Sequence, residues 1–134
     1  MSLGIGVMLG SLGGNSETVK AVKESIGKVI KSIELIDNVL VLRFADRYRL
    51  SLWDDGQSCC EVRYMETDDI LTEYEGATLL DFELKEAPEQ KAEYDVHEVQ
   101  FLDVKTDKGV ITFSNHNEHN GYYGGFWIVA KLES

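Results

Sequence analysis

The sequence predicts an α+β fold: a mainly antiparallel sheet, strongly curved or barrel-like, with one N-terminal helix and one short helix. Val19, Val22 and Ile26 recur at helical spacing within residues 16–26, which indicates one amphipathic helix. Much of the remaining chain alternates between apolar and polar residues, and turn signals separate these short segments. Closing the sheet into a barrel would remove its exposed strand edges.

The length of 134 residues suits a single domain. Residues 4–14 are rich in glycine and carry no charge, so we expect residues 1–14 to form a flexible arm. The α+β domain is then expected to span residues 15–134.

The predicted strands follow the helix in series, with short links between them. Asp37 and Asn38 favour a turn between the first two strands, and residues 106–109 favour a hairpin. A short helix is expected from residue 67 or 68 to residue 74, ended by Gly76. The predicted strands cover residues 29–35, 39–44, 47–53, 59–64, 78–86, 96–105, 109–114 and 123–132.

The charge balance limits the classes of partner. The chain has 13 Lys and Arg against 24 Asp and Glu, which gives a formal net charge of −11. This charge disfavours binding to nucleic acid or to anionic membranes. No apolar run approaches the length of a membrane span, and the first residues lack the positive charge of a signal peptide. We therefore expect a cytoplasmic protein.

Both cysteines lie next to each other, at Cys59 and Cys60, after a turn signal at Asp55 and Gly56. On a strand, adjacent side chains point to opposite faces, so the two thiols do not readily share a metal ion. A disulfide between them would be strained. Cys60 is expected to pack as a small apolar residue. Cys59 is expected to be half exposed, and the alternative is that it acts as a nucleophile or a metal ligand.

A second polar segment, residues 115–121, joins two predicted strands and reads as a loop because Asn and Gly favour turns. Its two histidines, His116 and His119, would share one face if the loop formed a single helical turn. Cys59 with either histidine would form a thiolate–imidazole pair of the kind that serves covalent catalysis. His97 is predicted to lie on a strand and to be structural.

Zinc is the cofactor that these residue types would accept, because it takes mixed nitrogen, oxygen and sulfur ligands. The candidate ligands are Asp54, Cys59, His116, Glu118 and His119. Their spacing matches no established zinc motif, and no nucleophile elbow, phosphate-binding loop or dinucleotide fingerprint occurs in the chain. The absence of a complete catalytic pattern favours a non-enzymatic protein.

An aromatic run follows this segment and supplies candidate contacts for a protein partner: Tyr122, Tyr123 and Trp127. Alternation along the last strand places Phe126 and Ile128 inward and Trp127 outward. Exposed Trp and Tyr side chains are enriched among the residues that dominate binding energy at protein interfaces. The alternative is that these rings pack against a helix or loop of the same chain.

Two motifs resemble those of an uncharacterised family of small bacterial and phage proteins. The first is Cys59-Cys60-Glu61, which follows a loop and leads into an acidic segment. The second is the C-terminal His-Asn-x-His-Asn-Gly-Tyr-Tyr run at residues 116–123. The resemblance covers approximately residues 25–132. It implies a phage or prophage setting and no particular activity.

These observations favour a non-enzymatic domain that binds a host or phage protein through an acidic and aromatic surface. The alternative is a metal-binding protein or Cys–His enzyme that uses Cys59, His116 and His119. The identity of the partner and the oligomeric state are left open. If the two motifs form one unit, residues 116–121 must pack against residues 54–61, with Asn side chains bracing the cysteine segment.

Overall fold

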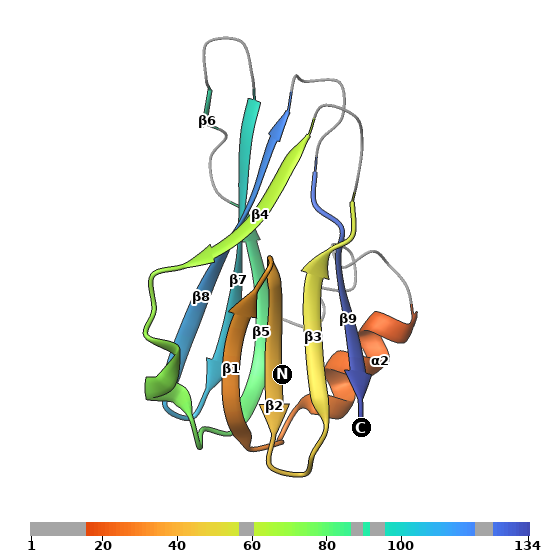
Figure 1. Cartoon of the computed structure of the whole chain (residues 1–134), viewed down its shortest axis with the longest axis vertical. Helices are drawn as coiled ribbons and strands as arrows, with labels where there is room; N and C mark the ends of the chain where they lie inside the picture. Colours follow the sequence, from red (N-terminus) through yellow and green to blue (C-terminus); the bar gives the residue numbers. More distant parts are fainter. Residues whose placement is uncertain (1–15, 57–60, 87–89, 92–95, 120–124) are drawn as a thin grey trace.

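The computed structural model of the chain describes residues 16–56, 61–86, 90–91, 96–119 and 125–134. Its strands form two antiparallel sheets (Figure 1), with the strand orders β1-β2-β3-β9 and β4-β8-β7-β5, and β6 pairs with β7. The α+β class and the antiparallel pairing are confirmed. The strongly curved or barrel-like sheet is wrong, because the strands divide between two sheets. The predicted arm at residues 1–14 lies outside the described residues.

The elements in chain order are α2 (Ser16–Ser25), β1 (Ile30–Ile36), β2 (Val39–Phe44), β3 (Arg49–Asp54), β4 (Val62–Thr67), the 3₁₀ helix η1 (Leu71–Tyr74), β5 (Leu79–Glu86), β6 (Gln90–Lys91), β7 (Val96–Thr106), β8 (Gly109–His119) and β9 (Ile128–Glu133).

The first sheet begins with three antiparallel strands, β1, β2 and β3, joined in series. Asp37 and Asn38 connect β1 to β2 with φ angles of 49° and 65°, the left-handed conformation that a tight hairpin turn requires at both central residues. Strand β9 then pairs with β3, from Arg49 opposite Glu133 to Asp54 opposite Ile128. The end of the chain therefore lies beside its first half.

The second sheet is built around a long hairpin of β7 and β8. The hairpin turns at residues 106–109, as predicted, and its register runs from Thr106 opposite Gly109 to Val96 opposite His119. Strand β8 continues through His119, so the predicted loop at residues 115–121 is wrong over its described part. Because β8 lies between β7 and β4, backbone pairing on both sides outweighs the local turn preference of Asn.

The apolar core lies between the two sheets. In Figure 1 the first sheet lies in front of β5, β7 and β8, and α2 lies beside β9. Thr18 of α2 accepts a hydrogen bond from the backbone N–H of Ala130 in β9 (3.2 Å), so the helix covers that strand's free edge. The largest fully buried side chains are Phe44, Phe82, Phe113, Ile30, Leu40, Leu42, Leu50, Leu52, Leu79 and Leu102.

Backbone hydrogen bonds connect the two sheets near β1 and β5. The N–H of Gly27 donates to the carbonyl of Leu79 (2.8 Å), and the N–H of Ile30 donates to that of Ala77 (2.7 Å). At the opposite side, neither β4 nor β9 has a second strand partner among the described residues. The arrangement is therefore open on that side, which is why it does not form a barrel.

Candidate functional site

A buried ionic cluster lies between the sheets above the apolar core. The Nη1 atom of Arg63 in β4 is 3.0 and 2.8 Å from the two carboxylate oxygens of Asp54 in β3, and its Nη2 atom is 2.8 Å from Glu61 Oε2. The three side chains are 13%, 10% and 2% exposed, respectively. We call Asp54, Glu61, Arg63 and Asn117 the Arg63 cluster.

Backbone groups complete the Arg63 cluster. Asn117 Nδ2 donates to Glu61 Oε2 (2.9 Å) and to the carbonyl of Gly125 (3.1 Å), which also accepts from Arg63 Nη1 (3.1 Å). Asp54 Oδ1 accepts from the N–H of Trp127 (3.1 Å). The contact between Asn117 and Glu61 joins the described parts of the two motifs, as expected if they form one unit.

His119 belongs to the same interior. Its side chain is 5% exposed, and its Nε2 atom is 2.5 Å from Glu98 Oε1. The same carboxylate oxygen accepts a hydrogen bond from the N–H of Gly125 (2.9 Å). Glu98 thus links His119 to the segment that leads into β9.

His116 lies on the other face of β8, on the outer side of the second sheet. Its ring stacks on Tyr64 with centroids 4.6 Å apart and planes inclined by 5°. Its Nδ1 atom is 2.9 Å from His97 Nε2, and its Nε2 atom is 3.0 Å from Ser114 Oγ. His116 and His119 therefore do not share a face, because this segment is a strand and not the helical turn that would bring them together.

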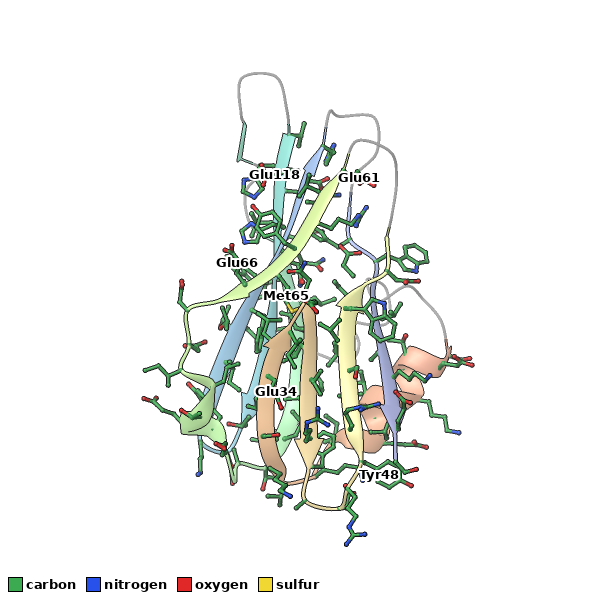
Figure 2. The ribbon with its side chains drawn as sticks, viewed as in Figure 1. Glu34, Tyr48, Glu61, Met65, Glu66 and Glu118 are labelled. Atoms are coloured by element: carbon green, nitrogen blue, oxygen red, sulfur yellow. The ribbon has the colours of Figure 1, made fainter. Side chains whose placement is uncertain are left out.

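Tyr64 and Glu118 extend this outer cluster. The hydroxyl of Tyr64 donates to Glu118 Oε2 at 2.6 Å, and this bond is the main reason that the pKa of Tyr64 is raised to about 12. Burial lowers the pKa of His116, and the neighbouring His97 acts in the same direction. Figure 2 shows Glu66 and Glu118 on one side of β4 and Glu61 on the other.

The structure divides the predicted zinc ligands between two places. Asp54 and His119 lie in the interior, whereas His116 and Glu118 lie on the outer face. Cys59 lies outside the described residues. No group of three or more His, Cys, Asp or Glu side chains among the described residues is arranged to hold a metal ion.

Sequence reasoning missed the contact between His97 and His116. The predicted hairpin at residues 106–109 could have revealed this contact. When its register is continued along both strands, Val99 lies opposite His116 and His97 lies opposite Glu118. Same-face side chains on neighbouring strands at such positions lie within reach of each other.

The aromatic residues are the third feature. Trp127 is 52% exposed, as predicted, while Ile128 is buried and Phe126 packs against the core. A groove of about 570 Å³ lies between α2 and the outer face of β3 and β9, and Trp53 is among its lining residues. Tyr122 and Tyr123 lie outside the described residues.

Fold and site define an open, two-sheet α+β domain with a buried ionic cluster and an exposed tryptophan. The chain belongs to the family described as "Domain of unknown function (DUF7448)", whose model matches residues 23–129. No curated protein and no solved structure matches the chain. Within the described residues, no helix is both long enough and apolar enough to span a membrane.

Proposed function

We propose that this protein is a non-enzymatic protein-binding domain of a phage or prophage, acting in the cytoplasm, and that it meets its partner through the outer face of β3 and β9. The observation that carries the proposal is the exposed Trp127, whose backbone pairs with Asp55, a residue that lines the groove along α2. Tryptophan is the side chain most enriched among residues that dominate the binding energy of protein interfaces. A half-exposed Trp is therefore a candidate anchor for a partner.

The groove offers a surface of mixed character next to this anchor. Trp53, Ala21 and Val129 contribute apolar area, whereas Glu17, Glu24, Asp55, Lys20 and Lys131 contribute charge at its walls. The indole N–H of Trp53 donates to Asp55 Oδ1 at 3.2 Å, which fixes the orientation of that ring. With a net charge of −11 on the chain, the expected partner is a host or phage protein segment with apolar side chains and positive charge.

The backbone that carries Trp127 is held rigidly. Its N–H donates to Asp54 of the Arg63 cluster (3.1 Å), and its carbonyl accepts from the N–H of Asp55 (2.8 Å). A backbone segment that is fixed before binding loses less conformational entropy when the complex forms. The Arg63 cluster therefore acts, in this proposal, as the support that presents Trp127.

The experiment is affinity capture of a partner from host lysate, followed by measurement of its affinity for purified variants. Trp127→Ala is expected to weaken binding at least about tenfold, the equivalent of about 1.4 kcal/mol. Ile70→Ala is the matched control, because Ile70 is also exposed but follows β4 in the second sheet. Equal affinities for the two variants, or catalytic turnover in place of a partner, would overturn the proposal.

The second candidate is a metal-binding protein or Cys–His enzyme that uses Cys59 with His116 or His119. Because the two histidines occupy opposite faces of β8, one of them at a time would join the thiol. The specific observation in its favour is that hydrogen-bond partners hold both ring nitrogens of His116, with His97 Nε2 at one and Ser114 Oγ at the other. Titration of the thiol across pH distinguishes this candidate, since a Cys59 paired with imidazole reacts at lower pH than a free thiol.

A further inference from the structure

We propose that His97 and His116 form a binding site for a divalent transition-metal ion of the copper, nickel or zinc class on the outer face of the second sheet. Two imidazole nitrogens, His97 Nε2 and His116 Nδ1, face each other at 2.9 Å. This pair differs from the ligand set expected from the sequence, because it includes His97, which was predicted to be structural, and keeps only His116 of the expected ligands. It also lies on a different sheet from Trp127 and does not depend on the protein-binding proposal.

The spacing of the two nitrogens suits a metal ion. Metal–imidazole bonds are about 2.0–2.1 Å long, so two nitrogens at neighbouring corners of a square are about 2.9 Å apart. That value equals the distance between His97 Nε2 and His116 Nδ1. Cu²⁺ and Ni²⁺ favour this square geometry. Tetrahedral zinc would separate the nitrogens to about 3.3 Å, a shift of a few tenths of an ångström in two rings.

The neighbours of His116 fix the tautomer that a metal requires. Ser114 Oγ donates to the carbonyl of Glu66 (3.4 Å) and lies 3.0 Å from His116 Nε2, which makes it the acceptor for that N–H. The lone pair of His116 is then on Nδ1, where it accepts the hydrogen bond from His97 Nε2–H. An incoming ion takes the place of this proton, which moves through solvent to His97 Nδ1 and leaves Nε2 free to bind the metal. Outer partners of this kind orient metal-binding histidines in proteins.

Two further features favour a cation at this place. The ring of His116 is held by its stacking on Tyr64, with ring centroids 4.6 Å apart. Two carboxylates add negative charge on the same face. Glu118 lies directly opposite His97 in the hairpin, and Glu66 lies 3.6 Å from His116 Nε2. Two imidazoles supply the protein nitrogens, and water would complete the coordination.

Isothermal titration of the full chain with NiCl₂, CuSO₄ and ZnSO₄ tests the site. One equivalent of ion is expected to bind, and His97→Ala or His116→Ala should each weaken binding at least about tenfold, since each removes one of two protein ligands. The matched controls are His119→Gln and the double variant Cys59→Ser/Cys60→Ser, which should retain wild-type affinity. Loss of binding in a control with retention in the His97 and His116 variants would overturn the proposal, as would no binding to the wild type.

A second measurement uses the wild-type chain, so its result does not depend on whether the variants fold. Carbethoxylation of histidine nitrogens, located by mass spectrometry, is followed with and without ZnSO₄ or NiCl₂. The ion should protect His97 and His116 together and leave the reactivity of the buried His119 unchanged. Equal modification of His97 and His116 in both conditions would rule out the site.

Discussion

Arg63 of β4 binds Asp54 of β3 through both carboxylate oxygens, at 3.0 and 2.8 Å, and this contact joins the two sheets at the end where the interior becomes polar. The same carboxylate accepts the N–H of Trp127. This ion pair therefore holds the two sheets together and also positions the backbone of Trp127, the proposed binding residue.

Removing this buried carboxylate should be costly. Asp54→Ala is expected to lower the free energy of unfolding by about 3 kcal/mol, the low end for a broken buried ion pair, because Glu61 still neutralises Arg63. Urea unfolding measures the change. The matched control is Glu34→Ala, which breaks an ion pair with Arg43 in which both side chains are 44% exposed, and it should cost less than about 1 kcal/mol. Similar small losses in both variants would contradict a stabilising role for the Arg63 cluster.

Two asparagines on the inner face of β8 should respond in opposite ways to replacement by leucine. Asn115 is 1% exposed, and among the described residues neither of its amide atoms has a hydrogen-bond partner, so Asn115→Leu should raise the free energy of unfolding by about 1 kcal/mol. Asn117 donates to Glu61 and Gly125, so Asn117→Leu should lower it by about 1–3 kcal/mol. Thermal and urea unfolding compare the variants. A loss of stability in Asn115→Leu equal to that in Asn117→Leu would refute this assignment.

His116 should make stability depend on acid pH. Burial lowers its pKa from the usual 6.5, and His97 adds to this effect, while Glu66 and Glu118 oppose it. The unfolded chain then binds a proton more readily, so this contribution to stability is present above pH 6.5 and is lost as the pH falls below it. Urea unfolding across this range should show a shallower decline for His116→Gln than for the wild type. Identical pH profiles would argue against a desolvated imidazole.

Tyr64 should ionise at unusually high pH. Its hydroxyl donates to Glu118, which raises its pKa to about 12 from the usual 10.0, so the stability from this bond is present below pH 10.0 and is lost as the pH rises toward 12. Tyrosinate absorbance, taken as the difference between the wild type and Tyr64→Phe, measures the pKa. Glu118→Gln should return it toward 10.0. A pKa that stays near 12 in that variant would place the cause elsewhere.

Local signals in the sequence predicted many single elements well. The strand at residues 39–44 has the bounds of β2, and the turn at Asp37 and Asn38 takes the positive φ angles that those residue types tolerate. The hairpin at residues 106–109 was also correct. In each case, neighbouring residues determine the outcome, so a short stretch of sequence contains the required information.

Features that depend on distant pairing were not predicted. The division into two sheets rests on the pairing of β3 with β9, which joins Arg49 to Glu133, and no local pattern specifies it. The Asn-rich segment was expected to turn, yet Asn115 and Asn117 extend β8 because β4 and β7 pair with both its edges. Of the candidate site residues, Trp127 was correctly predicted to point outward. The face of the sheet on which His119 lies was not predicted, because residues 115–121 were expected to form a loop and not part of β8.

The proposal that Trp127 anchors a protein partner is tested most directly by photo-crosslinking in the host cell. A photoreactive phenylalanine analogue is placed at position 127 in one variant and at position 70 in another, since both native side chains are exposed. We expect one discrete crosslinked protein from position 127, carrying a positively charged segment, and none from position 70. The same crosslinked species from both positions, or none from position 127, would contradict it.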